Sequence, residues 1–114
     1  MNNSVHLDPG HYDLFEIAHI EELPAGERLF VDIGDQPIVV FNIDGEIYAV
    51  GDICTHDDGP LGDGDLEAYV LVCPRHGARF DTRSGKVISL PAVVDIPSYP
   101  VKVVDGVIFL CMPK

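Results

Sequence analysis

Cysteine, basic residues and long apolar runs are all scarce in this sequence, and each shortage excludes a class of protein. There are only three cysteines, an odd number that does not suit the disulfide framework of a small secreted protein. No apolar run approaches the roughly 20 residues that a membrane-spanning helix needs. The chain does not start with a basic stretch followed by an apolar one, so no signal peptide is predicted. We therefore expect a cytoplasmic protein.

Positive charge is the second shortage. Seven Lys and Arg residues stand against 19 Asp and Glu residues, so the formal net charge is −12 at pH 7. A surface of this sign repels nucleic acid and anionic membranes. It favours protein partners that present a basic docking face, and it serves solubility equally well.

Glycine, proline and apolar residues are plentiful by comparison. Apolar residues make up 46% of the 114 residues, enough for a hydrophobic core and too many for a disordered chain. This length fits one domain, residues 1–114. Residues 1–10 show no periodicity and are predicted to form a flexible arm. The 11 glycines and 9 prolines indicate many turns, and so short strands rather than long helices.

Short segments rich in β-branched and aromatic residues follow one another along the chain, as is typical of strands. Asp44-Gly45 and Asp105-Gly106 are strong hairpin signals, because a type I′ turn requires positive φ at both central residues. Ser84-Gly85 indicates a third, weaker turn. No segment keeps helical spacing for more than two turns, so the predicted fold is all-β. The predicted strands are residues 12–18, 29–33, 38–43, 46–50, 66–72, 79–82, 86–89, 101–104 and 107–112.

Two loops interrupt this succession of strands, and each contains a cysteine and a histidine. The first, residues 51–65, has Cys-Thr-His at 54–56, and the second has Cys-Pro-Arg-His at 73–76. Thiolate and imidazole are common ligands of zinc, iron and iron–sulfur centres. The two loops therefore predict one four-ligand site. Its ligands are Cys54, His56, Cys73 and His76.

The mixture of ligands within each loop bears on the kind of centre. A structural zinc site usually joins two cysteines in one turn and two histidines on a helix. Here each loop supplies one of each, and no helix follows. If one iron of a two-iron cluster takes both thiolates and the other both imidazoles, each loop must offer one ligand to each iron. Mixed loops thus favour a [2Fe–2S] cluster over the alternative, a zinc-stapled interaction module, and Cys–His catalysis is favoured least.

The spacing of these four residues resembles a known signature. Cys-x-His, then 16 residues, then Cys-x-x-His resembles the motif of Rieske iron–sulfur proteins. The resemblance covers roughly residues 12–112. Further matches are Phe80-Asp81, Ser84-Gly85-Lys86, Leu90-Pro91-Ala92 and the segment 96–100.

The resemblance implies an architecture and a role for each ligand. The fold would be a Rieske-type antiparallel β-sandwich with a small inserted cluster-binding subdomain at about residues 53–92. Cys54 and Cys73 would hold the inner iron, and His56 and His76 the outer iron near solvent. The side chains expected to cover the cluster are those of Leu61, Pro91 and Ala92.

Four positions depart from the Rieske proteins of respiratory and photosynthetic complexes. Those proteins carry a disulfide between the loops, and its two cysteines would fall at Gly59 and Arg75. They also place Ser and Tyr hydroxyls near the cluster sulfurs, where this chain has Ala78 and Phe80. Hydrogen bonds to sulfur raise the reduction potential. The resemblance is therefore to the soluble Rieske ferredoxins, with no disulfide and a low potential.

Such ferredoxins carry single electrons from a flavin reductase to a terminal ring-hydroxylating oxygenase. Other roles within the family are the small subunit of an assimilatory nitrite reductase and a partner of iron–sulfur assembly proteins. The chain is too short to contain the mononuclear iron domain of an oxygenase, so it is not expected to turn over a substrate alone. Cys111, in an apolar strand, is predicted to be a buried structural residue.

Overall fold

The fold is built from short antiparallel strands, as predicted. The computed structural model describes residues 12–55, 58–90, 92 and 94–113. Over these residues it has three sheets, with strand orders β1-β11-β10, β2-β3-β4-β9 and β5-β6-β7-β8. The elements are β1 (Tyr12–His19), the 3-10 helix η1 (Ile20–Glu22), β2 (Arg28–Ile33), β3 (Gln36–Ile43), β4 (Glu46–Gly51), β5 (Leu66–Glu67), β6 (Val70–Val72), β7 (Arg79–Asp81), β8 (Val87–Ser89), β9 (Ser98–Tyr99), β10 (Val101–Val104) and β11 (Val107–Pro113).

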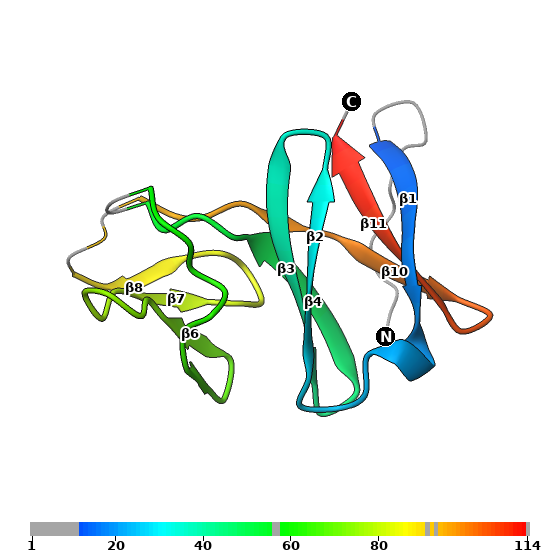
Figure 1. Ribbon diagram of the computed structural model, residues 1–114, viewed down its shortest axis with the longest axis horizontal. Coiled ribbons are helices and arrows are strands. Elements are labelled where there is room, and N and C mark those ends of the chain that lie inside the picture. The colour runs from blue at the N-terminus through cyan, green and yellow to red at the C-terminus, as the bar shows by residue number, and fades with distance from the viewer. Residues whose placement is uncertain (1–11, 56–57, 91, 93, 114) are drawn as a thin grey trace.

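Strand β3 is the centre of the molecule because both of its faces are buried. Side chains alternate between the two faces of a strand. Ile38 and Val40 pack in one apolar cluster with Ile108 and Leu110 of β11, which joins the β2–β3–β4–β9 sheet to the β1–β11–β10 sheet. Val39, Phe41 and Ile43 pack in a second cluster, which contains Leu71 and Phe80 of the third sheet. In Figure 1, β3 and β4 accordingly lie between the β1–β11 sheet and the sheet that contains β6, β7 and β8.

The predicted hairpin turns are confirmed. Asp44 and Gly45 have φ of 55° and 93°, and Asp105 and Gly106 have φ of 51° and 76°, as a type I′ turn demands. Gly85 at the third turn also has positive φ, 79°.

One predicted strand is wrong. Residues 66–72 do not form a single strand but a tight hairpin, in which β5 turns back on β6 and Leu66 pairs with Leu71. The turn includes Ala68 at φ 55°, a left-handed conformation that alanine rarely adopts. The sequence has no Gly or Asn there to indicate a turn, so the apolar run was indistinguishable from a continuous strand. The predicted arm, residues 1–10, lies outside the described residues.

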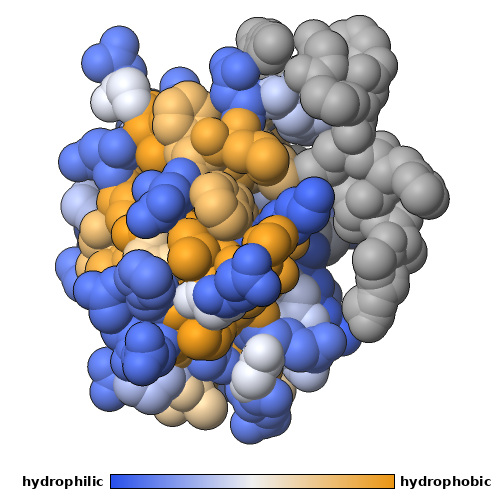
Figure 2. Space-filling view, turned by 90° about the vertical axis from the view of Figure 1, so that its right-hand side faces the viewer, coloured by the Kyte–Doolittle hydropathy of each residue, from blue (hydrophilic) through white to orange (hydrophobic). Residues whose placement is uncertain are grey.

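The outer face of the β1–β11–β10 sheet lies at the opposite end of the molecule from β8. Figure 2 shows this face, where apolar surface is interspersed with charged groups. Leu14, which pairs with Cys111, is 53% exposed there, and Val104, which pairs with Val107, is 42% exposed. Within the described residues, no helix is both long and apolar enough to cross a membrane.

The close packing of Gly85 against the backbone of Ile96 can be tested by substitution. A Cβ at Gly85 would lie 2.0 Å from the Ile96 carbonyl oxygen, whereas a Cβ at Gly26 would meet nothing within 4 Å. Both glycines have positive φ, so Gly85→Ala and Gly26→Ala share the conformational cost of about 1 kcal/mol. We expect Gly85→Ala to lower the thermal unfolding midpoint by clearly more than Gly26→Ala, measured by circular dichroism. Equal midpoints would contradict the close approach of residues 85 and 96.

Candidate metal centre

Cys54 lies in a loop after β4 that closes on itself through backbone hydrogen bonds. The Cys54 amide donates to the Gly59 carbonyl at 2.8 Å, and the Asp58 amide donates to the Cys54 carbonyl at 2.8 Å. Asp58 has φ 60°, a region that Asp tolerates better than most residues. An antiparallel bridge between Ile53 and Pro60 joins the two sides of the loop. These contacts fix the backbone that presents the Cys54 thiol.

Cys73 lies in a second loop, between β6 and β7, with the same pattern of hydrogen bonds. Its amide donates to the Ala78 carbonyl at 2.7 Å, and the Gly77 amide donates to the Cys73 carbonyl at 3.1 Å. Gly77, at φ 75°, takes the place that Asp58 has in the first loop. The sequence did not indicate that the loops are equivalent, because the histidines follow their cysteines at different spacings.

The two thiols are buried in one apolar cluster, although they come from separate loops. Cys54 is 0% exposed and Cys73 is 2% exposed. Leu61, Ala78 and Phe80 belong to the same cluster. A thiolate in such surroundings is unfavourable unless a positive charge is paired with it. The arrangement therefore suits two thiolate ligands of a metal centre that is shielded from water.

Of the two predicted histidine ligands, the structure describes only one. His76 is exposed on the second loop. His56 lies outside the described residues. Among the residues that are described, no group of three or more His, Cys, Asp or Glu side chains could hold a metal ion. The full ligand set Cys54, His56, Cys73 and His76 thus stays a prediction, for which the described part shows two buried thiols and one exposed imidazole.

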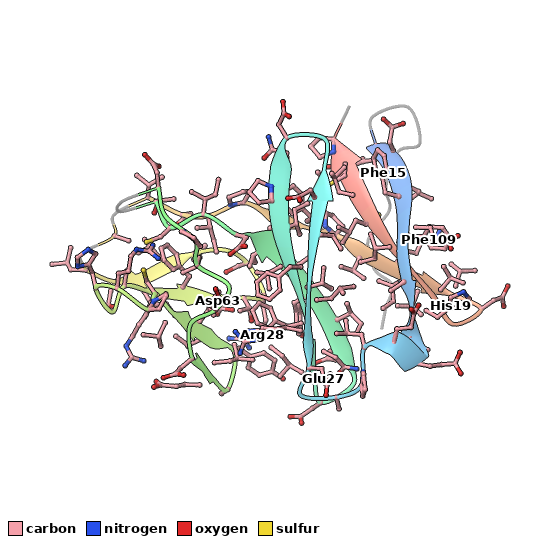
Figure 3. All side chains as sticks on the ribbon, in the orientation of Figure 1. Phe15, His19, Glu27, Arg28, Asp63 and Phe109 are labelled. Atoms are coloured by element: carbon pink, nitrogen blue, oxygen red, sulfur yellow. The ribbon has the colours of Figure 1, made fainter. Side chains whose placement is uncertain are left out.

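Two charged side chains that the sequence analysis did not single out hold the end of the first loop. The Asp52 carboxylate accepts the amides of Leu61 at 3.0 Å and Gly62 at 2.5 Å. From β2, Arg28 Nη1 donates to the carbonyls of Gly62 at 2.5 Å and Gly64 at 2.8 Å. Figure 3 labels Arg28 and Asp63 where β2 and this loop meet. The sequence did not indicate the contact between Arg28 and the first loop, because Arg28 is 34 residues from Gly62.

The Gly residues of this segment are required by close packing. A Cβ at Gly64 would lie 1.8 Å from the Val72 carbonyl oxygen, and one at Gly62 would lie 2.6 Å from the Phe30 ring. The first loop is therefore seated directly against the base sheet and against β6.

Two of the three side chains expected to cover the cluster are buried beside the thiols. Leu61 and Ala92 are buried in the cluster that holds the thiols. Pro91 lies outside the described residues. Ala78 and Phe80 are each 0% exposed and pack in the same cluster, so no hydroxyl is contributed at these two positions.

None of the three cysteines forms a disulfide. Cys111 is buried in β11, as predicted, but it belongs to neither apolar cluster. Burial raises the pKa of the Cys111 thiol, with a smaller opposing effect from Lys102. This thiol is therefore protonated at neutral pH and structurally separate from the thiol pair.

Three antiparallel sheets and two equivalent cysteine loops, whose thiols share one apolar cluster, make up an all-β protein with a candidate metal centre. The donors fit a cluster in which thiolates hold one iron and imidazoles the other, because the thiols are buried and His76 is exposed. The comparison with family models agrees: the model described as Rieske [2Fe-2S] domain matches residues 13–100. The chain belongs to the Rieske [2Fe–2S] domain family.

Relatives of known function support the same conclusion. The chain is 35% identical to the ferredoxin component of the naphthalene 1,2-dioxygenase/salicylate 5-hydroxylase systems of Ralstonia sp., over 85% of this chain and 93% of the relative. It is 38% identical to the 3-phenylpropionate/cinnamic acid dioxygenase ferredoxin subunit of Escherichia coli K12, over 83% of this chain and 90% of the relative.

A solved structure has the same fold. The ferredoxin of carbazole 1,9a-dioxygenase from Nocardioides aromaticivorans IC177 superposes with a TM-score of 0.81 at 29% identity, covering 89% of this chain and 98% of that chain. The predicted cofactor and fold are thus confirmed: this is an electron-transfer protein with a Rieske cluster, not the catalytic subunit of an oxygenase system.

The ligand assignment can be tested by changing one histidine. Replacing His76 by Cys should shift the visible absorption spectrum towards that of an all-cysteine ferredoxin, or abolish the cluster, because a thiolate donates more charge to iron than an imidazole does. His19→Cys, at an exposed position at the end of β1, is the control and should leave the spectrum unchanged. An unaltered spectrum for His76→Cys would show that the ligand is misassigned.

Proposed function

We propose that this chain is the ferredoxin component of a ring-hydroxylating oxygenase system. It would accept single electrons from a flavin reductase and pass them to the terminal oxygenase. The observation that carries this proposal is the likeness to two ferredoxin components of dioxygenase systems, each over more than four-fifths of the chain. A further neighbour, 27% identical with a TM-score of 0.81, comes from a structure titled as a complex of reduced oxygenase and oxidized ferredoxin in carbazole 1,9a-dioxygenase.

The four predicted ligands would hold the cluster, with the cluster-binding subdomain at about residues 53–92 inserted in a single domain. When bound, the cluster supplies one-electron redox chemistry. The chain contributes geometry and exclusion of water. Cys54 and Cys73 would bind from the buried side, while His56 and His76 would bind nearer the solvent.

The residues around the thiols favour a low reduction potential. Ala78 and Phe80 are buried beside them and offer no hydroxyl to a cluster sulfur. Without those hydrogen bonds the reduced state is less stabilised, which lowers the potential.

Voltammetry tests this argument. We expect a midpoint near −150 mV, the low end of the range for Rieske centres, and a midpoint above about +100 mV would refute it. Ala78→Ser should raise the midpoint, because it returns a hydroxyl beside the thiols. Ala49→Ser buries an equal hydroxyl in the other apolar cluster and should leave the midpoint unchanged.

An apolar rim at the loop end favours close approach of a protein partner. Leu90 is 75% exposed, Val94 58% and Ile88 51%. The Thr55 hydroxyl donates to the Val94 carbonyl, which ties this segment to the first cysteine loop. Exposed apolar side chains that group together on a surface are typical of protein contact sites. With a net charge of −12, the chain is suited to partners whose docking face is basic.

The rim can be tested by stopped-flow measurement of electron transfer from the reduced protein to its oxygenase. We expect Leu90→Ser to lower the second-order rate constant by about five- to tenfold, the loss typical of an apolar contact at an interface. Leu14→Ser, at a leucine of β1 that is 53% exposed and lies at the other end of the molecule, should have no effect. Equal rates for both variants would contradict docking at the rim.

Reconstitution tests the function itself. The purified chain should be coloured, reducible through a flavin reductase with NADH, and required for turnover by the oxygenase. A colourless protein with stoichiometric zinc would support the interaction-module alternative instead.

The small subunit of a nitrite reductase from Mycobacterium tuberculosis shares the fold at 20% identity and a TM-score of 0.77, which supports the fold alone. A cytoplasmic location is part of the proposal.

A further inference from the structure

Arg75 links the two cysteine loops. It lies in the second loop, two residues after Cys73, yet its Nη1 donates to the Pro60 carbonyl of the first loop at 2.5 Å. Its Nη2 lies 3.5 Å from Cys73 Sγ. A guanidinium has five donors in a rigid planar fork, so one side chain can serve a carbonyl and a sulfur together.

Gly59 of the first loop provides the space for this guanidinium. A Cβ at Gly59 would lie 2.7 Å from Arg75 Cζ, 2.7 Å from Nη2 and 3.0 Å from Nε. The planar group therefore lies against the bare Cα of residue 59. Gly59 is not among the glycines with positive φ, so the backbone conformation does not require glycine there. The missing Cβ instead leaves room for the Arg75 guanidinium.

The other arginines of the third sheet are engaged differently. Arg79 Nη1 pairs with Glu67 at 2.5 Å, and Arg83 pairs with Asp81 at 2.9 Å. Each joins strands or turns of its own sheet. Arg79 is thus a suitable control for Arg75, since its removal changes the net charge equally while leaving the contact between the cysteine loops intact.

We propose that Arg75, seated on Gly59, is a clasp that holds the two cysteine loops together and keeps a positive charge beside the Cys73 sulfur. The proposal rests on the proposed ligand assignment, because it makes Arg75 a positioning residue for the cluster. A permanent cation at this sulfur stabilises the thiolate and favours the added electron. The clasp thus acts on both retention of the cluster and its potential.

The first experiment measures loss of visible absorption from the oxidised protein in excess chelator. Arg75→Gln should release the cluster about fivefold faster than the wild type, the effect of losing a charge-assisted hydrogen bond in a partly exposed setting. Arg79→Gln should match the wild type, because an exposed ion pair contributes little. Arg75→Gln should also show a more negative midpoint in voltammetry, whereas Arg79→Gln should not. Equal release rates for the two variants would overturn the clasp.

Gly59→Ala separates geometry from charge. It displaces the guanidinium without changing any charge, and the atoms it meets are at the far end of a flexible side chain, so the fold is retained. We expect faster release for Gly59→Ala alone and no additional effect in the Arg75→Gln background. An additive effect would show that Gly59 acts independently of Arg75. Arg75→Lys, which keeps the charge but loses the fork, should release the cluster faster than the wild type.

A second readout does not depend on the cluster. Hydrogen–deuterium exchange of peptides covering residues 53–60 reports the Cys54–Gly59 and Asp58–Cys54 backbone hydrogen bonds. In the protein as purified, exchange should be several-fold faster in Arg75→Gln than in Arg79→Gln. If the wild type proves colourless while this difference persists, the proposed function fails and the clasp stands. If the wild type is coloured and the exchange rates are equal, the clasp fails and the proposed function stands.

Discussion

The burial of strand β3 on both faces is the constraint on which the rest of the structure depends. One face, with Ile38 and Val40, packs against the β1–β11–β10 sheet and so closes the base of the molecule. The other face, with Val39 and Phe41, forms the floor of the cluster that contains both thiols. Because alternate side chains of one strand belong to different cores, a slip of one residue in register would disrupt both at once. The same strand therefore positions both the base and the two thiols.

The two cysteine loops are held by backbone hydrogen bonds within each loop and by side-chain hydrogen bonds. Each cysteine loop is closed internally by the same pair of backbone hydrogen bonds, so each thiol has a defined local direction. Three side chains then fix the loops. Asp52, at the start of the first loop, accepts backbone amides near the end of that loop, and Arg28 of β2 binds that end to the base. Arg75 binds the second loop to the first. An electron carrier benefits from such rigidity, since little reorganisation accompanies a change of charge on a preorganised site.

Much of the fold could be predicted because its signals are local. Asp-Gly turns and alternating β-branched residues act within a few positions, and they gave the correct hairpins. The 66–72 segment failed for the complementary reason. Its turn at Ala68 is imposed by pairing of β5 with β6 and by the position of Gly64 against Val72, and no local residue preference indicates it.

The sequence by itself determined which ligand types are available, their division between two loops, the all-β class and the absence of cysteine at positions 59 and 75. These follow from residue identity and spacing. Only the tertiary structure decided that Cys54 and Cys73 share one buried apolar cluster and that Arg75 rests on Gly59. Those contacts join residues 15 or more positions apart, and they arise from packing against a common floor, which no local pattern in the chain encodes.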